Sequence, residues 1–424
     1  MNDNIATPFA KPLYVMLKPA GAHCNLDCKY CYYLEKNNLY NTSQRHLMTD
    51  EILEQFTQEY IEAQTMNQVL FTWHGGEPLM RSIDFYKKAL ELQKKYAHGK
   101  QIDNVIQTNG TLLTDEWCAF FAQNHFLVGI SIDGPQEYHD HYRQTSAGKP
   151  SWEKVMHGIS LLKKHRVEWN AMAVVNAYNA EHPLEFYHFF RDNGCQYLQF
   201  TPIVERLTEH EDGRTLASLA DVSHEDNYED VGNAKKQKEN QEITIANFSV
   251  TPEQWGKFLC TIFDDWVRHD VGKIFVEIFD CTLANWVGVQ PGICAYSKEC
   301  GHAGVMEHNG DVFSCDHFVF PEYKLGNIQD KSLIDMLYGE KQQAFSRLKH
   351  TSLPRQCKEC DMEFACHGEC PKNRFENDKY GEPGLNYLCK GYYEYYTHVA
   401  PYMDFMKREL QAQRPPANIM NVLK

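Results

Sequence analysis

The sequence predicts an α/β fold with a parallel sheet, followed by a cysteine-rich C-terminal region. Two observations lead to this prediction. Short apolar runs rich in β-branched or aromatic residues alternate with amphipathic helical patterns up to about residue 204, and the cysteines gather in two separate regions. Strands that alternate with helices indicate parallel pairing through right-handed crossovers. Periodicity alone leaves open whether the sheet is doubly wound or rolled into a barrel.

The elements follow one another in a regular order. The expected strands are Leu13–Lys18, Val69–Trp73, Asn104–Thr108, Leu127–Ile132, Glu168–Val175 and Tyr197–Ile203. The expected helices between them are Asp50–Thr65, Ile83–Tyr96, Thr114–Asn124, Trp152–His165 and Pro183–Asp192. A further amphipathic helix runs to about Asp270 from Thr251, whose hydroxyl can cap it. The segment Tyr392–Gln411 is expected to form a last helix, with its tyrosines serving as packing.

The composition limits the possible partners. The 424 residues suffice for one large domain and a smaller one. Lys plus Arg number 42 against 57 Asp plus Glu, and the net charge of −15 disfavours nucleic acid as a partner. No apolar run approaches the roughly 18 residues of a membrane span, and Met1–Ala10 lacks the features of a secretory signal. We therefore expect a soluble, cytoplasmic protein with no membrane partner.

The 15 cysteines are too many for chance in a cytoplasmic chain and indicate metal or redox chemistry rather than disulfides. Most of them lie in spaced motifs. Cys118, Cys195, Cys260 and Cys281 are scattered, and we expect them to be buried core thiols.

A loop with Cys-x3-Cys-x2-Cys spacing, Cys24, Cys28 and Cys31, follows the first strand. Three thiolates on one short loop can hold three irons of a four-iron, four-sulfur cluster and leave the fourth iron open to a substrate. A structural zinc site would need a fourth nearby ligand, and His23 adjoins Cys24 too closely to serve well. The loop therefore predicts an iron–sulfur cluster with one open iron.

This loop resembles that of the radical S-adenosylmethionine enzymes, in which an aromatic residue, here Tyr30, precedes the third cysteine. The resemblance implies a partial, six-stranded, TIM-like (β/α) barrel with its site at the C-terminal ends of the strands. It also implies that the open iron binds S-adenosylmethionine, which then gives a 5′-deoxyadenosyl radical.

The residues after the second and third strands fit such a site. Gly75-Gly76-Glu77 follows the second strand, and two glycines let the backbone approach a ligand closely. In the family this tripeptide holds the amino group of the methionine moiety, although a bare Gly-Gly-Glu is often only a turn. Asn109 begins an Asn-Gly turn that could be purely conformational; we include it among the candidate cofactor contacts.

Three further candidate contacts come from the resemblance. Ser131 and Arg143 follow the fourth strand and match residues that contact the ribose and the carboxylate of S-adenosylmethionine. An arginine suits a carboxylate because its planar fork donates two parallel hydrogen bonds. Val204, after the sixth strand, matches an apolar contact to the adenine. A turn and a helix start are the plain alternative for the first two.

The second half carries eight more cysteines in spaced motifs. If the last cysteine of a dense run is shared between two sites, as in two-cluster ferredoxins, the cysteines divide evenly. One cluster would be held by Cys294, Cys300, Cys315 and Cys370, and a second by Cys357, Cys360, Cys366 and Cys389. Two zinc sites of four thiolates each are the alternative.

This C-terminal pattern resembles the SPASM domain of radical enzymes that modify peptides, and within that group the anaerobic sulfatase-maturating enzymes. We expect the barrel over residues 1–248, with an acidic, polar loop insertion at about 205–247. A bridging helical segment should cover 249–292, and the SPASM domain with the C-terminal helix 293–424.

The resemblance implies an oxidoreductase that converts a Cys or Ser of a sulfatase into formylglycine. The adenosyl radical would remove a hydrogen from Cβ, using three [4Fe-4S] clusters and S-adenosylmethionine. The substrate would be an unfolded sulfatase segment with a Cys/Ser-x-Pro-x-Arg motif, and the reductant a protein such as flavodoxin or ferredoxin. The alternative is another SPASM-type peptide maturase that forms thioether or carbon–carbon crosslinks.

Asp316, directly after Cys315, is the candidate catalytic base, since the family places its proton acceptor here. Burial and a nearby negative cluster should both raise the pKa of this carboxylate and make it a better base. A carboxylate that caps local backbone N–H groups is the structural alternative.

Overall fold

The computed structural model describes residues 12–33, 36, 39–40, 47–210, 213–216 and 243–423. The expectation for Met1–Ala10 falls outside these residues, as does most of the acidic insertion. The chain divides into two compact units. Unit 1 comprises Met1–Ser131, Tyr142–Trp169 and Gly301–Ser346, and unit 2 comprises Ile132–His141, Asn170–Cys300 and Arg347–Lys424.

Unit 1 contains the first four parallel strands. They are β1 (Tyr14–Leu17), β2 (Gln68–Trp73), β3 (Gln101–Thr108) and β4 (Leu127–Ser131). Each pairs in parallel with the next, from Met16 opposite Thr72 to Val105 opposite Leu127. The helices between them are α1 (Asp50–Ala63), α2 (Ile83–Tyr96), α3 (Asp115–Gln123) and α5 (Trp152–His165). The predicted alternation is confirmed here, with α2 and α5 at the expected bounds.

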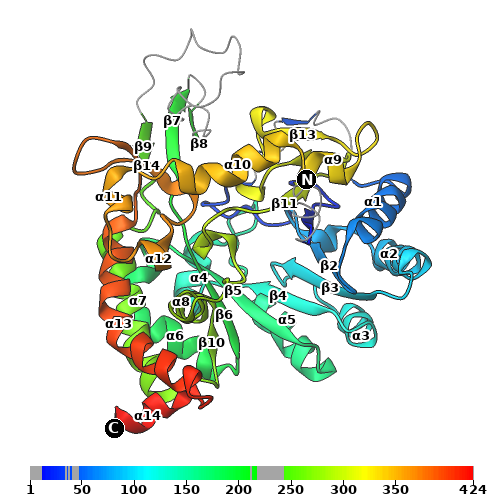
Figure 1. Ribbon diagram of the computed structural model, residues 1–424. Coiled ribbons are helices and arrows are strands. Elements are labelled where there is room, and N and C mark those ends of the chain that lie inside the picture. The colour runs from blue at the N-terminus through cyan, green and yellow to red at the C-terminus, as the bar shows by residue number, and fades with distance from the viewer. Residues whose placement is uncertain are drawn as a thin grey trace. The chain divides into compact units, whose positions relative to one another are not determined.

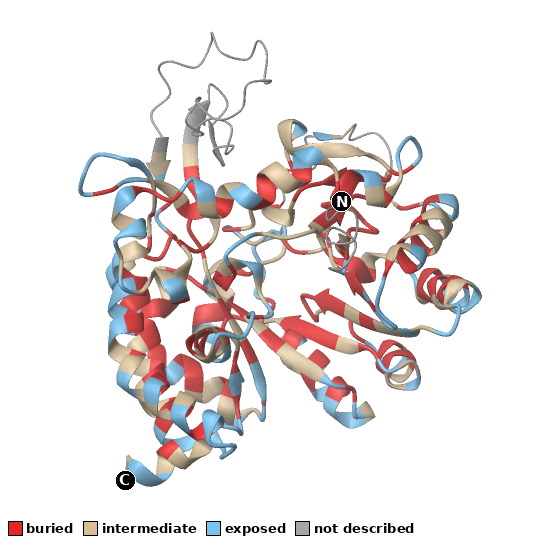
Figure 2. Ribbon diagram, viewed as in Figure 1, coloured by how far each residue is buried: buried red, intermediate tan, exposed pale blue. Residues whose placement is uncertain are grey.

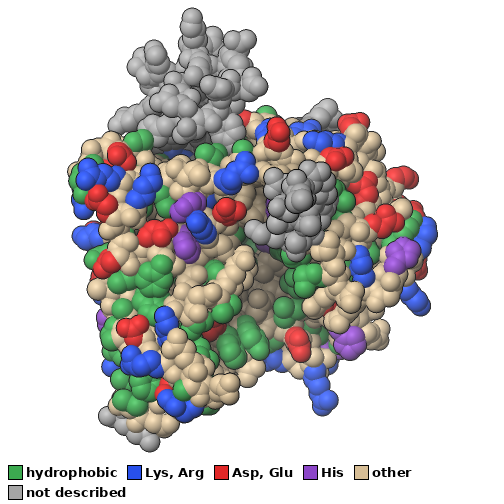
Figure 3. Space-filling model, viewed as in Figure 1, with side chains coloured by type: hydrophobic (Ala, Val, Ile, Leu, Met, Phe, Trp, Pro, Cys, Tyr) green, Lys and Arg blue, Asp and Glu red, His purple; other side chains and the backbone are tan. Residues whose placement is uncertain are grey.

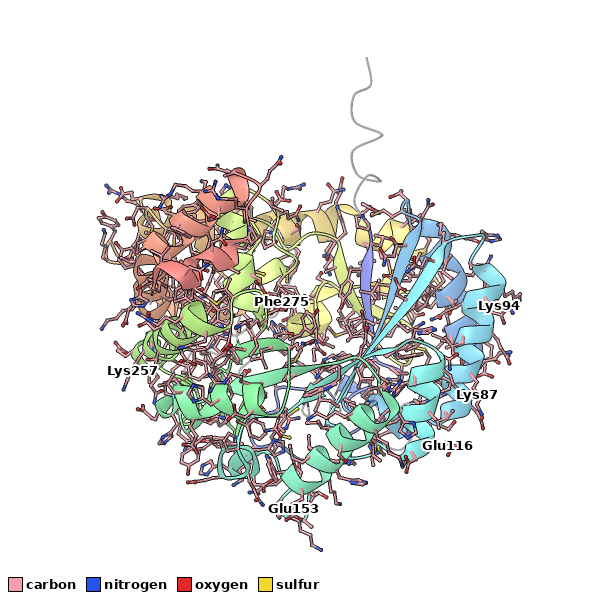
Figure 4. The ribbon with its side chains drawn as sticks, turned by 90° about the horizontal axis from the view of Figure 1, so that it is seen from below. Lys87, Lys94, Glu116, Glu153, Lys257 and Phe275 are labelled. Atoms are coloured by element: carbon pink, nitrogen blue, oxygen red, sulfur yellow. The ribbon has the colours of Figure 1, made fainter. Side chains whose placement is uncertain are left out.

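The helices of unit 1 are amphipathic as the sequence indicates. Figure 1 shows α1, α2 and α3 on the same side of strands β2 and β3. Aromatic residues fill the space between, and the rings of Trp73 and Tyr86 lie 5.4 Å apart in an edge-on arrangement. Lys87, Lys94 and Glu116 point outward from α2 and α3, as Figure 4 shows. Figure 2 shows the same division between buried strands and exposed helix faces.

A segment from the second half of the chain extends the sheet of unit 1. Strand β11 (Ala303–Met306) pairs in parallel with β1, with Tyr14 opposite Ala303. Strands β12 (Asp311–Phe313) and β13 (Lys324–Asn327) continue antiparallel. The helix α9 (Leu333–Leu337) and most of α10 (Glu340–Thr351) complete this segment. None of these elements was predicted from the sequence.

Unit 2 holds most of the second set of strands and the longest helices. The parallel strands are β5 (Trp169–Val175), β6 (Tyr197–Pro202) and the short β10 (Phe275–Val276), in the order β10-β6-β5. The helices include α4 (Gln136–Tyr142), which continues into unit 1, α6 (Pro183–Asp192), α7 (Pro252–His269), α8 (Glu277–Val287), α11 (Arg355–Lys358), α12 (Glu363–Cys366), α13 (Cys389–Gln411) and α14 (Ile419–Val422). A two-stranded sheet is formed by β14 (Arg374–Asn377) and β15 (Pro383–Asn386).

Helices α7 and α13 pack closely because glycines face each other. A Cβ on Gly391 would lie 2.2 Å from the carbonyl oxygen of Pro252, and a Cβ on Gly256 would lie 3.0 Å from the Gly391 Cα. Tyr392, Tyr395 and Tyr396 of α13 are buried, whereas Tyr393 is exposed, and Tyr392 meets Trp255 edge-on at 6.0 Å. The expected packing role of the buried tyrosines is therefore confirmed, although the helix begins earlier than expected, at Cys389.

Two expectations need correction in unit 2. The polar insertion was expected to be a loop throughout, but its described ends form an antiparallel sheet of β7 (Arg206–His210), β8 (Gly213–Leu216) and β9 (Ile243–Ile245). Backbone pairing between the two ends supplies hydrogen bonds that a polar composition does not reveal. Cys260 is only half-buried, whereas the other three scattered cysteines are buried as expected.

None of the described helices combines the length and the apolarity needed to cross a bilayer. On the face shown in Figure 3, acidic and basic side chains are interspersed.

Helix α7 begins with a capping box that can be tested. The Thr251 hydroxyl accepts a hydrogen bond from the Gln254 N–H (3.2 Å), and the Thr251 N–H donates to Gln254 Oε1 (3.0 Å). We predict that Thr251→Ala lowers the free energy of unfolding by about 1 kcal/mol, measured by denaturant unfolding of anaerobically purified protein. Lys257→Ala, on the exposed face of the same helix (Figure 4), is the control. Equal stability of the two variants would contradict the prediction.

Candidate active site and cluster-binding cysteines

The loop with Cys24, Cys28 and Cys31 follows β1 in unit 1, and all three cysteines are half-buried. The Cys31 N–H donates to the Cys28 carbonyl (2.9 Å), which closes the turn between them. The Cys24 Sγ accepts from the Leu26 N–H (3.4 Å) and from Asn109 Nδ2 (3.7 Å). Burial raises the pKa of the Cys24 thiol to about 11, so bonding to iron must supply the energy of deprotonation.

The glycines after β2 let a second loop pack on the cysteine loop. The Gly76 N–H donates to the Gly21 carbonyl and the Glu77 N–H to the His23 carbonyl, both at 2.8 Å. A Cβ on Gly76 would lie 2.3 Å from the His23 carbonyl oxygen, so only glycine fits. Gly75, at φ +137°, also adopts a conformation that favours glycine. The two glycines therefore hold the backbone of the cysteine loop.

The Glu77 carboxylate is fully buried and joins its own loop after β2 to the end of β3. Oε1 accepts from the Thr108 hydroxyl (2.7 Å) and the Leu79 N–H (2.9 Å), and Oε2 accepts from the Asn109 N–H (2.8 Å). Burial raises its pKa to about 7, against these hydrogen bonds, which lower it. A carboxylate has about four acceptor positions, so about one remains for a ligand.

Arg143 and Tyr30 are positioned together. Arg143 Nη1 donates to the Tyr30 hydroxyl (2.9 Å), and both side chains are buried. The Lys29 N–H donates to the Tyr142 carbonyl (3.0 Å), which ties the segment carrying Arg143 to the cysteine loop. Tyr30, Glu77, Asn109 and Arg143 thus gather around Cys24 within unit 1, as the sequence indicated.

The other two candidate cofactor contacts have ordinary structural partners. The Ser131 hydroxyl accepts from Gln107 Nε2 (2.9 Å) at the end of β4. Val204 belongs to unit 2, where it is buried and its carbonyl accepts from Lys372 Nζ (3.0 Å).

Asp316 lies in unit 1 beside a buried lysine. Lys18 Nζ is 2.5 Å from Asp316 Oδ1, and the Tyr32 hydroxyl donates to Oδ2. The Lys18 side chain has no exposed surface, and that of Asp316 is 16% exposed. Lys18 follows β1 directly and Asp316 comes shortly after β12, so the pairing of β1 with β11 brings them together.

The pKa expected for Asp316 was wrong in direction. Burial raises it, but the Lys18 ammonium, together with the imidazoles of His74 and His317, outweighs this and holds the pKa of Asp316 well below its usual range. Asp316 is therefore an ionised carboxylate. The expectation for Asp316 rested on burial and a negative cluster and left out Lys18. A lysine between a buried strand and the cysteine loop is the feature of the sequence that could have indicated this partner.

His74 is a third member of this cluster. Its Nδ1 accepts from the Gly75 N–H (2.9 Å) and lies 3.4 Å from Lys18 Nζ. Burial and Lys18 together lower the pKa of His74 to about 4. The ring is therefore neutral, and with both donors on Nδ1 its own proton is assigned to Nε2.

Cys357, Cys360, Cys366 and Cys389, the proposed second set, all belong to unit 2. Burial raises the pKa of Cys389 to about 12, with Cys357 and Cys360 acting in the same direction. Burial also raises the pKa of Cys366, with Cys389, Glu369 and Cys357 acting in the same direction. Cys357 lies within the four-residue helix α11, Cys366 ends α12 and Cys389 starts α13.

The other proposed set is divided between the units. Burial raises the pKa of Cys370, and Cys294 and Cys300 act on it in the same direction, so these three lie together in unit 2. Cys315 belongs to unit 1. Among the described residues, no three His, Cys, Asp or Glu side chains are grouped as ligands of a single metal ion.

The buried surroundings of these thiols fit iron–sulfur clusters. Within the described part of the chain, the Tyr392 hydroxyl is buried without a hydrogen-bond partner, and Cys366 is among the groups that act on it electrostatically. A buried hydroxyl needs an acceptor, and the sulfides of a cluster are acceptors of hydrogen bonds that tune it.

Two family models match this chain. Residues 19–190 match the radical SAM superfamily, and residues 299–361 match SPASM, an iron-sulfur cluster-binding domain. The second match favours iron–sulfur clusters over the zinc alternative for the C-terminal cysteines.

Curated relatives resemble the whole chain. A serine-type anaerobic sulfatase-maturating enzyme of Bacteroides thetaiotaomicron is 66% identical over 100% of this chain and 98% of its own length. A cysteine-type anaerobic sulfatase-maturating enzyme of Clostridium perfringens is 30% identical over 92% of this chain and 97% of its own.

A solved protein shares the fold. The structure of native anSMEcpe with bound AdoMet has a TM-score of 0.79 and 29% identity, and the match covers 94% of this chain and 100% of that one. The same protein with AdoMet and the Cp18Cys peptide has a TM-score of 0.77 and 28% identity, with the same coverage. The predicted partial six-stranded (β/α) barrel followed by a cysteine-rich SPASM domain is confirmed.

The packing of the glycine loop on the cysteine loop makes a sharp prediction. Gly76→Ala should displace the His23 carbonyl and with it Cys24, so that the protein loses the open-iron cluster. Iron per chain should fall from about twelve to about eight, measured on anaerobically reconstituted protein. Gly292→Ala is the control, since a Cβ there meets no atom within 4 Å. Full iron content in Gly76→Ala would show that this packing is dispensable.

Proposed function

The chain belongs to the anaerobic sulfatase-maturating enzymes, which are radical S-adenosylmethionine enzymes with a SPASM domain, and from this premise we propose how its own residues act. The reaction is the oxidation of a Cys or Ser of a sulfatase to formylglycine, and the cofactors are three [4Fe-4S] clusters and S-adenosylmethionine. The full-length relatives described above are sulfatase-maturating enzymes, which favours this reaction over the alternative of a crosslink-forming maturase.

We propose that Cys24, Cys28 and Cys31 hold the cluster with the open iron. The bound S-adenosylmethionine supplies a 5′-deoxyadenosyl radical that removes a hydrogen from the substrate Cβ. The cofactor site comprises Tyr30, Gly75, Gly76, Glu77, Asn109, Ser131, Arg143 and Val204. The hydrogen bonds that join Glu77, Asn109, Tyr30 and Arg143 around Cys24 support this assignment. Arg143 provides a buried positive charge for the methionine carboxylate.

The remaining eight cysteines hold the two auxiliary clusters in this proposal. Cys294, Cys300, Cys315 and Cys370 bind the first, and Cys357, Cys360, Cys366 and Cys389 bind the second. The proximity of the last four thiols to one another, and of Cys370 to Cys294 and Cys300, supports this division. The domain boundaries at residues 248 and 292 remain part of the proposal.

The observation that carries the mechanism is the Asp316 carboxylate fixed by Lys18 and Tyr32. The substrate must lose the hydrogen from Cβ, the hydroxyl or thiol proton, and one further electron to become the aldehyde or thioaldehyde. Asp316 is ionised and partly exposed, so it can accept that proton. Proton transfer also weakens the attraction of Asp316 for Lys18, whose ammonium then stabilises a developing negative charge on the substrate.

We infer that serine is the residue oxidised, because the relative with 66% identity is serine-type. A hydroxyl is a weaker acid than a thiol, so its deprotonation depends on the Lys18 ammonium stabilising the anion that forms on the substrate. The substrate segment carries a Ser-x-Pro-x-Arg or Cys-x-Pro-x-Arg motif in an unfolded sulfatase chain. A reductant such as flavodoxin or ferredoxin supplies electrons in the cytoplasm, and no nucleic acid takes part.

Replacing the base tests the mechanism. Asp316→Asn should reduce formylglycine formation to background, because the amide cannot accept the proton, while S-adenosylmethionine still binds. Product is measured by mass spectrometry of a synthetic peptide and binding by calorimetry under anaerobic conditions. Asp330→Asn, an exposed carboxylate in the same unit, is the control. Product formation by Asp316→Asn at the control's rate would remove Asp316 from the mechanism.

A pair of peptides tests the substrate. With two peptides that differ only in Ser or Cys at the first motif position, we expect aldehyde formation from the serine peptide. Loss of S-adenosylmethionine and gain of aldehyde are followed together by chromatography and mass. If the cysteine peptide alone reacts, the serine assignment is wrong, and if neither reacts while the cofactor is cleaved, the motif is not the substrate.

A further inference from the structure

A buried lysine and a half-buried arginine lie among the cysteines of unit 2, and the mechanism above uses neither. Lys349, near the end of α10, has no exposed surface. Its Nζ donates to the carbonyl oxygens of Ala295 (2.6 Å) and Ser297 (2.5 Å), and to that of Cys294. All three carbonyl oxygens thus belong to the short turn from Cys294 to Ser297, and Cys294 is a proposed cluster ligand.

This geometry requires the charged form of Lys349. An ammonium group has three donors and no acceptor, and here three carbonyl oxygens receive them. A neutral amine has only two donors, so its lone pair would face one of the carbonyl oxygens. Three carbonyl dipoles directed at Nζ also stabilise a positive charge in a buried place. Lys349 is therefore a fixed cation.

The titratable groups around Lys349 are the buried Glu369 carboxylate and three thiols that we assign to the first auxiliary cluster. Burial lowers the pKa of Lys349, while Cys300, Cys294, Glu369 and Cys370 act in the opposite direction. Lys349 in turn acts on Cys294 and Cys300 as the leading charge that offsets their burial. No other lysine within the described residues has this combination of complete burial and three carbonyl partners.

Arg374 is the second cation and holds the loop between the two sets of cysteines. Its guanidinium donates to the carbonyls of His367 (2.7 Å), Gly368 (2.8 Å) and Glu369 (3.0 Å), and also to that of Lys349. These three loop residues all have positive φ, at 48°, 66° and 55°. A run of left-handed residues is unfavourable on its own, so Arg374 stabilises it.

The position of this loop gives the cations distinct roles. It connects Cys366 of the second set with Cys370 of the first, and Cys366, Cys370 and Cys357 all act on Arg374. Arg374 is therefore shared between both sets, whereas the thiols that act most strongly on Lys349 are those of the first set. The two residues are joined, since Arg374 donates to the Lys349 carbonyl.

A fixed charge changes how easily a cluster is reduced. A cluster with four thiolate ligands gains one further negative charge on reduction, and a nearby buried cation stabilises the reduced form more than the oxidised form. The effect is large where water is excluded and small at an exposed lysine.

On the proposed assignment of the cysteines, we propose that Lys349 raises the reduction potential of the auxiliary cluster held by Cys294, Cys300 and Cys370, and so makes it the better electron acceptor of the two. Lys349 is a positioning and electrostatic residue, since it contacts the cluster ligands and no substrate. Arg374 acts on both clusters and fixes the loop between them.

The test is an electron paramagnetic resonance redox titration of the full-length, anaerobically reconstituted enzyme. Addition of S-adenosylmethionine identifies the signal of the open-iron cluster, which leaves the two auxiliary signals. In Lys349→Met we expect the potential of one auxiliary cluster to fall by at least about 59 mV, which is tenfold in its reduction equilibrium, and the other to stay unchanged. Lys358→Met, an exposed lysine beside Cys357, is the control and should shift neither.

Two further readouts keep the outcomes separate. Lys349→Gln keeps two donors without the charge, so it should shift the same potential even if Lys349→Met binds iron poorly. In both variants we expect less formylglycine per S-adenosylmethionine cleaved. Unchanged potentials, or loss of one cluster's iron in both variants, would overturn the proposal in favour of a purely structural lysine. Wild-type protein without about twelve irons would instead show that the cluster assignment itself is wrong.

Discussion

The contact between Lys18 and Asp316 is the interaction on which the active-site region depends. Lys18 is completely buried, and an isolated buried charge is strongly unfavourable, so each side chain needs the other. The pair joins the end of β1 to the segment after β12, and it rests on the parallel pairing of β1 with β11. Tyr32 and His74 add further polar contacts. A strand from the C-terminal region is thereby an integral part of the unit that carries the cysteine loop.

Close backbone contacts serve the same unit. Gly76 lets the loop after β2 lie against the carbonyl of His23, and the buried Glu77 then connects that loop to Asn109. Asn109 reaches the sulfur of Cys24. Gly76, Glu77 and Asn109, which we assign to S-adenosylmethionine binding, thus also hold the cysteine loop in shape. Because the same groups do both, a change that harms cofactor binding is expected to harm cluster binding as well.

The C-terminal cysteines have two cations beside them, the buried Lys349 and the half-buried Arg374. Lys349 binds the turn after Cys294 and Arg374 binds the left-handed loop before Cys370. Both cations use all or most of their donors on backbone carbonyls, so their charges stay fixed near the thiols. Buried carbonyl groups at such turns need hydrogen-bond donors. Negatively charged clusters are stabilised by nearby positive charge. Lys349 and Arg374 supply both the donors and the positive charge.

Local patterns in the sequence determined most of the elements and the motifs. Apolar periodicity located the helices Ile83–Tyr96, Trp152–His165 and Pro183–Asp192 at their observed bounds, and cysteine spacing indicated the clusters, because both depend on neighbours a few residues apart. Only the tertiary structure decided three other features. These are strand β11, the ion pair of Lys18 with Asp316, and the carbonyl partners of Lys349. Each joins segments far apart in the chain, and the charge or hydrogen bond that makes burial possible is supplied by the distant partner.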